Sequence, residues 1–144
     1  MKAWHFLPND GMTRYEPRQA VAVGQTLIVD PDKLQLCEYG LHASVNALAA
    51  ANYAPGTIVC RVKLGGRILE QDDKACASER TVIALADASD VLCLFARQGA
   101  LDVSHLWDAP AIVREYLETG NDSSRSAAWA ARSAAARSAR SAES

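Results

Sequence analysis

Residues 37–56 read CEYGLHASVNALAAANYAPG, and their order predicts a strand, a cap, a short helix and a stop. Residues 40–43 are short and apolar enough to end a strand, and Ser44 is a good N-cap for a helix over 45–53. Pro55 and Gly56 end that helix. A side chain at such a strand end is held beside the next helix, so His42 is the first candidate site residue. The alternative is a structural histidine, and a site needs a second and a third group.

The chain before this segment is predicted to be rich in β-strands. Residues 2–7 alternate bulky side chains and are followed by a turn at 8–11, which predicts a first strand containing His5. An extended segment is expected over 17–23, followed by short strands over 26–29 and 34–37.

The chain after this segment predicts more strands. Residues 57–64, TIVCRVKL, have the β-branched content and alternation of a strand. Gly65 and Gly66 predict a hairpin turn into a partner strand over 67–70, followed by a polar loop over 71–80. Residues 81–86, TVIALA, are apolar throughout, as expected of a central strand buried on both faces.

Two helices are expected next. The first is capped by Asp87 or Ser89, carries an apolar stripe and ends at Gly99; the stripe is Val91, Leu92, Leu94 and Phe95. The second follows Pro110 and stops at Gly120. The fold class is therefore α+β, with one globular domain over 1–120 and a helical tail rich in Ala, Ser and Arg over 121–144.

Composition and charge exclude several classes. Residues 123–144 hold four arginines and one glutamate, which leaves a net charge of −5 on residues 1–122 out of −2 for the chain. An acidic body argues against nucleic-acid binding except through the basic tail. No apolar run is long enough for a membrane span, and the start is too polar for a signal peptide, so a cytoplasmic protein is expected.

The four cysteines are spaced without a CxxC pair, which argues against a zinc site. Cys60 and Cys93 lie in apolar runs, so we expect both to be small buried hydrophobes of a reducing cytoplasm. Asp72 and Asp73 are expected to be a solvated loop pair rather than a metal site. The motifs of serine hydrolases, P-loop NTPases, dinucleotide-binding folds and zincins are absent.

The tail has one feature that suggests a partner. Arg125, Trp129 and Arg132 share one face of the expected helix. This face is either a docking stripe for an acidic partner or nucleic acid, or simply a solvated helix surface.

Four features follow one another along the chain: a strand with a histidine, the GLHAS segment of residues 40–44, a helix that ends at Tyr53, and a strand that contains VKLG at 62–65. This order resembles the ADP-ribosyltransferase fold. The resemblance implies that His5 holds a ribose of NAD, with Ser44 and Tyr53 beside the substrate. His42 stands where the poly-ADP-ribose polymerase branch has a tyrosine. A histidine at this position is more similar to the RNA 2′-phosphotransferase branch. Glu79 or Arg80 falls where the third group of either branch is expected. NAD is implied only if the protein is an enzyme.

A second resemblance covers residues 1–98. The segments AWHFLPNDG, CEYGLHAS, VCRVKLGG and TVIALADAS resemble a small phage and prophage domain family of unknown function. This implies a mobile-element context. The first expectation is therefore an accessory protein that binds a host protein, with inhibition of a host defence system, as by an anti-CRISPR protein, as one form. The alternative is an ADP-ribosyltransferase or RNA 2′-phosphotransferase-like enzyme.

Overall fold

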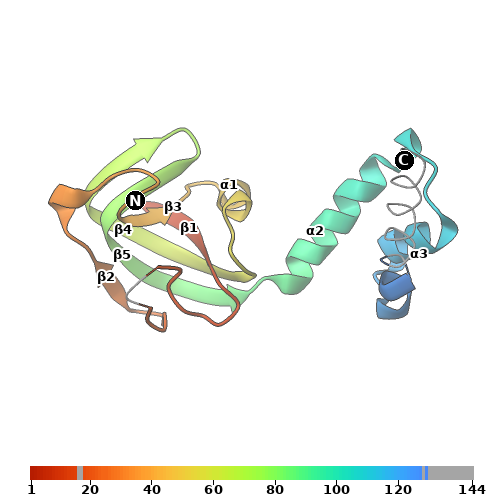
Figure 1. Ribbon diagram of the computed structural model, residues 1–144, viewed down its shortest axis with the longest axis horizontal. Helices are drawn as coiled ribbons and strands as arrows, with labels where there is room; N and C mark the ends of the chain where they lie inside the picture. Colours follow the sequence, from red (N-terminus) through yellow and green to blue (C-terminus); the bar gives the residue numbers. More distant parts are fainter. Residues whose placement is uncertain (16–17, 128, 130–144) are drawn as a thin grey trace, which may run out of the picture. The chain divides into compact units, whose positions relative to one another are not determined.

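The computed structural model describes residues 1–15, 18–127 and 129. They form an antiparallel sheet of five strands together with α- and 3-10 helices (Figure 1). The α+β class predicted from the sequence is therefore confirmed. The chain divides into two compact units, Met1–Ser89 and Asp90–Ser144. The domain boundary expected at residue 120 stays a prediction.

The sheet lies in the N-terminal unit. Its strands are β1 (Lys2–Leu7), β2 (Thr26–Ile28), β3 (Leu41–Ala43), β4 (Ile58–Gln71) and β5 (Lys74–Asp87). The strand order is β1-β4-β5-β2, and β3 pairs with the first part of β5 on the same edge as β2. Figure 1 shows β4 and β5 as long, bent ribbons. The predicted strands over 2–7 and 26–29 are confirmed, the second of them one residue shorter.

The sheet closes on itself between its first strand and β3. The N–H of Trp4 donates to the carbonyl of Ser44 at 2.7 Å, and the N–H of Ser44 donates to the carbonyl of Trp4 at 2.9 Å. This bridge turns β1, β4, β5 and β3 into a small barrel, which removes two sheet edges. Its interior holds the core, formed by Ala3, Leu7, Ala43, Cys60, Val62, Leu64, Ala75, Ala77 and Val82.

The predicted hairpin at Gly65 and Gly66 is wrong, because β4 runs through both glycines and turns at Asp72 and Asp73. The glycines mark a bulge: the register shifts between Gly65 and Ile68, and Gly66 has φ +63°. The predicted loop over 71–80 is likewise mostly strand, because its backbone pairs with β4 on one edge and with β2 and β3 on the other. A bulge and a turn use the same residue types, so the local sequence does not separate them.

The segment over 81–86 is not buried on both faces. Val82 is inside the barrel, whereas Ile83 is 43% exposed on the outer face. The inner face of the barrel is its buried face, so an apolar side chain on the outer face does not imply that another layer of structure covers it.

Two local predictions around the GLHAS segment are corrected. Ser44 is buried in the bridge to Trp4, and the cap of helix α1 (Ala47–Asn52) is Asn46, whose side chain accepts from the N–H of Leu48 at 2.8 Å. Ser44 does not cap the helix because its backbone N–H and carbonyl are hydrogen-bonded to Trp4 in the barrel. The helix is therefore shorter than the predicted 45–53.

The segment over 34–37 is not a strand. It follows a 3-10 turn, η1 (Pro31–Lys33), and doubles back through a bridge between Gln35 and Tyr39. Cys37 has φ +69° at this reversal, which a strand residue does not adopt. The extended segment expected over 17–23 begins outside the described residues, and its described part forms one bridge, from Ala20 to Met12.

The C-terminal unit contains α2 (Ser89–Asp102), η2 (Ser104–Leu106) and α3 (Ala111–Thr119). Gly120 ends α3 with φ +70°, as predicted, but α2 continues past Gly99. Residues 122–127 are helical. No helix in the described ranges is long and apolar enough to cross a membrane.

All four cysteines are free thiols. Cys60 is buried, as expected, but the prediction for Cys93 is wrong, because that thiol is exposed on α2. The helix around Cys93 buries none of its residues, so an apolar sequence neighbourhood did not produce burial there.

Gly40→Ala should destabilise the barrel more than Gly24→Ala. Both glycines have positive φ, +132° and +85°, but an added Cβ at Gly40 would lie 2.1 Å from the Cys76 sulfur, whereas at Gly24 it meets nothing within 4 Å. We expect a loss of roughly 1 to 2 kcal/mol for Gly24→Ala from backbone strain alone. Gly40→Ala should lose about 3 kcal/mol or more, because overpacking adds to the strain. Urea unfolding measures both, and equal losses would contradict the packing at Gly40.

Candidate functional site

The barrel brings three predicted site residues together. His5 lies on β1, between the inward residues Ala3 and Leu7. Arg80 lies on β5 and is 4% exposed. Its Nη1 donates to the main-chain carbonyl of His42 at 2.9 Å. The closure of β1 against β3 is what places these groups side by side, so we call His5, Arg80 and the His42 carbonyl the interior cluster.

Arg80 is a cation in an apolar core. Burial lowers the pKa of its guanidinium to about 10, which still leaves it charged at neutral pH. Its Nε is buried and has no hydrogen-bond partner among the residues that the structure describes. The neighbouring thiol of Cys60 keeps its proton, because burial raises its pKa against the opposing effect of Arg80.

His5 is neutral in this setting. Burial, followed by the charge of Arg80, lowers the pKa of His5 well below 6.5, and a hydrogen bond to the His42 backbone opposes the shift. The residue as a whole is partly accessible, but its ring is buried. A neutral imidazole beside a guanidinium can donate one N–H or accept one proton.

The His42 side chain has a structural role. Its Nε2 accepts the N–H of Cys37 at 3.0 Å and so stabilises the left-handed turn at that residue. Burial lowers the pKa of His42, which favours the neutral form that can accept this hydrogen bond. The carbonyl of His42, rather than its ring, belongs to the interior cluster.

Glu79 lies away from the cluster. It is exposed and follows the strand alternation onto the side opposite Arg80, where its carboxylate lies against Gly65 and Gly66. Ser44 contributes its backbone to the barrel bridge. Tyr53 is on the surface, where its hydroxyl donates to Asp73 and the ammonium of Lys74 lies 5.4 Å from its ring centre.

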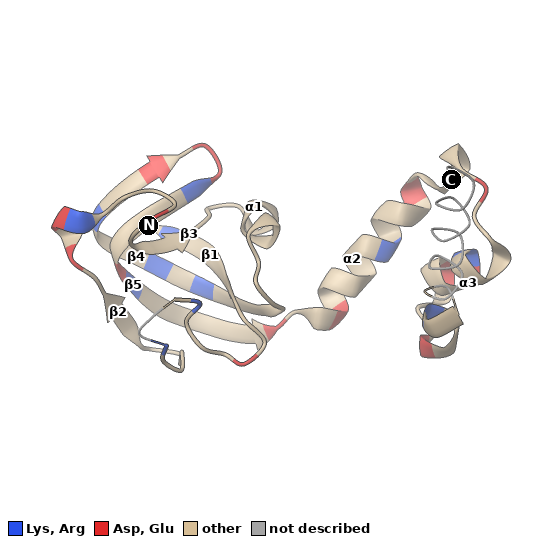
Figure 2. Ribbon diagram, in the orientation of Figure 1, with Lys and Arg blue, Asp and Glu red and all other residues tan. Residues whose placement is uncertain are grey.

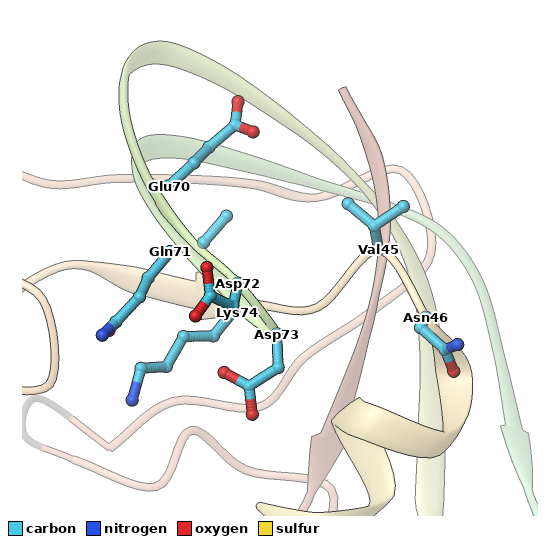
Figure 3. Close-up of a pocket in the computed structure, with 8 residues that line it drawn as sticks. Val45, Asn46, Glu70, Gln71, Asp72, Asp73 and Lys74 are labelled. Atoms are coloured by element: carbon cyan, nitrogen blue, oxygen red, sulfur yellow. The ribbon is translucent and has the colours of Figure 1, made fainter.

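A pocket of about 350 Å³ lies at the β4–β5 turn (Figure 3). Most of its lining residues have polar side chains, and they come from the turn and the residues before α1: Val45, Asn46, Glu70, Gln71, Asp72, Asp73, Lys74 and Ala75. The two aspartates were expected to be a solvated loop pair, and this hollow was not predicted, although the acidic turn was an available signal. No group of His, Cys, Asp and Glu in the described part of the chain can hold a metal ion.

The tail residues are partly described. Arg125 forms an ion pair with Asp122 at 3.1 Å, and Arg125, Ser126 and Trp129 line a hollow of about 310 Å³. Arg125 and Trp129 therefore do lie close together, as their spacing predicted. Arg132 lies outside the described residues.

The residues of the barrel and the start of α2 match a known family model. It is described as Domain of unknown function (DUF7666), and the match covers residues 1–93. The chain belongs to the DUF7666 family. The predicted similarity to a domain family of unknown function is thus confirmed over residues 1–93, and the DUF7666 description assigns no activity. No curated protein and no solved structure matches the chain.

The protein should lose stability between pH 7 and pH 5. His5 and His42 both have pKa values lowered below 6.5, so the unfolded state binds protons that the folded state refuses. The free energy of unfolding should therefore fall as the pH drops through 6.5, by at most about 1.4 kcal/mol per pH unit for each histidine. Urea unfolding at pH 7, 6 and 5 measures this slope.

His5→Gln should flatten the slope, and His105→Gln is the control because His105 is an exposed residue of η2. An unchanged slope in His5→Gln would show that His5 is not held neutral by the fold.

Proposed function

We propose that this DUF7666 protein is a phage- or prophage-encoded accessory protein that binds a protein of the host cell in its cytoplasm. Inhibition of a host defence system, in the manner of an anti-CRISPR protein, is the form we favour. The observation that carries the proposal is the apolar stripe of α2, formed by Val91, Leu94 and Phe95. These side chains are 68%, 49% and 59% exposed.

The stripe has the properties of a partner-binding helix face. Its residues follow the i, i+3, i+4 spacing of one face, and α2 buries none of its 14 residues. Figure 2 shows α2 as a largely uncharged ribbon, with Asp90, Arg97 and Asp102 as its charged residues. An amphipathic helix that presents such a face fits an apolar groove on another protein. Arg125 and Trp129 offer a second contact with an acidic surface.

Leu94→Gln with Phe95→Gln should abolish capture of the host protein. Apolar anchors that act as hot spots contribute about 2 kcal/mol each at an interface, or about 4 kcal/mol for the two, so we expect the Kd to rise by roughly several hundredfold. The measurement is affinity capture from host lysate, identification of the bound protein, and calorimetric titration with that protein after purification.

Ala96→Gln is the matched control, because Ala96 is exposed on the opposite face of α2 and should leave the Kd unchanged. Equal affinity of the double variant and the wild type would contradict the proposal. A change in oligomeric state on size-exclusion chromatography with light scattering, without loss of partner binding, would instead assign the stripe to self-association.

The second candidate is an enzyme, an NAD-dependent ADP-ribosyltransferase or an RNA 2′-phosphotransferase-like protein. The convergence of His5, Arg80 and the His42 carbonyl favours it. Cleavage of a nicotinamide bond calls for a carboxylate near the sugar, and Glu79 lies on the other side of its strand. A guanidinium suits a phosphate group, so the geometry favours the phosphotransferase form.

Calorimetric titration with NAD, and incubation of labelled NAD with host lysate, test the enzyme. Saturable binding with label transfer is expected in the wild type, and His5→Ala should reduce transfer at least a hundredfold, as removal of a general acid or base does. Glu79→Gln separates the two enzymes when a 2′-phosphorylated RNA is supplied: movement of its phosphate onto the ADP-ribose of NAD, with release of nicotinamide, persists in a phosphotransferase, whereas transfer of labelled ADP-ribose to a host acceptor is lost in an ADP-ribosyltransferase. The absence of both binding and transfer would exclude the enzyme and leave His5 as a structural residue.

A further inference from the structure

The guanidinium of Arg80 is charged, buried and under-compensated. One hydrogen bond, from Nη1 to the His42 carbonyl, satisfies one of its five N–H groups, and Nε has no partner. Within residues 1–15, 18–127 and 129, no carboxylate forms an ion pair with it. Removing a cation from water without a counter-charge is costly, and an apolar side chain of similar volume is often more stable at such a position.

Two other arginines have an unsatisfied nitrogen but a different environment. Arg61 stacks its guanidinium on the Trp4 ring, 4.5 Å from the ring centre, on the outer face of β4. Arg97 lies against Gly120, at the C-terminal end of α3, where the helix dipole favours a cation. Arg80 has neither an aromatic face nor a helix end, so its charge has no such compensation.

The groups around Arg80 are arranged to receive an anion. With Nη1 used by the His42 carbonyl, the edge of the guanidinium formed by Nε and Nη2 is left for a bidentate contact. The ring of His5 is neutral and its single N–H donates to the His42 backbone, so its second nitrogen is an acceptor and adds no second buried charge. His5 is partly accessible as a residue, although its ring is buried.

We propose that the interior cluster is a binding site for an oxyanion, a phosphate group in particular, held by the free edge of Arg80, with the second ring nitrogen of His5 accepting from a phosphate hydroxyl. The bound anion supplies the counter-charge that the chain lacks. The site shares Arg80 with the phosphotransferase candidate and deepens it, but its test requires neither the protein partner nor turnover of NAD, so its failure can be told apart from the failure of either proposed function.

Thermal unfolding of the full chain in inorganic phosphate, against sodium chloride of equal ionic strength, tests the site. At ten times its Kd, phosphate should raise the Tm of the wild type by roughly 3 to 8 °C. Arg80→Met should abolish this rise, and its Tm without phosphate should equal or exceed that of the wild type, because the buried charge is gone. Arg61→Met is the matched control and should keep the full phosphate effect.

Two further arms complete the test. Arg80→Lys keeps the charge but loses the bidentate edge, so its phosphate affinity should fall at least tenfold; it also replaces Arg80→Met if that variant fails to fold. AMP against inorganic phosphate distinguishes a phosphate carried on a nucleotide from the free anion, and adenosine, which has no phosphate, should leave the Tm unchanged. The proposal is overturned if 50 mM phosphate leaves the wild-type Tm unchanged, or if Arg80→Met shows the same rise.

Discussion

The pair of backbone hydrogen bonds between Trp4 and Ser44 is the constraint on which the N-terminal unit depends. Without them, β1 and β3 would be edges of an open sheet with unpaired N–H and C=O groups. With them, β4 and β5 bend far enough to enclose a core built largely from small residues, such as Ala3, Ala43 and Ala75. Small side chains are needed there because the interior of a barrel with so few strands is narrow.

The same closure creates the polar interior. It brings the His42 carbonyl within reach of Arg80, and it places His5 against both groups. The low dielectric of the interior makes the burial of the Arg80 charge unfavourable and keeps His5 neutral. The cluster therefore lowers the stability of the fold and also provides a chemically specific environment. The proposed protein-binding stripe lies on α2 and the proposed anion site lies inside the barrel, so neither proposal requires the other.

Local physics was enough for several elements. The alternation in β1 and the glycine stop of α3 both follow from neighbouring residues, and both were predicted from the sequence. The role of Gly65 and Gly66 was not, because a turn and a bulge place the same demand on backbone angles, and only the pairing of β4 with β5 decides between them. The predicted capping role of Ser44 was wrong because its backbone pairs with Trp4, a residue distant in sequence.

For the candidate site, the sequence by itself determined the residue types and the strands that carry them: His5 and Arg80 were identifiable, as was the strand end at His42. It also determined the α+β class, since strand alternation and helix signals are short-range. The tertiary structure alone decided that Arg80 points into the core while Glu79 points out, and that His42 contributes its carbonyl rather than its ring. The reason is physical: side-chain direction along a strand is fixed only once register and closure are fixed, and both depend on hydrogen bonds between residues far apart in the chain.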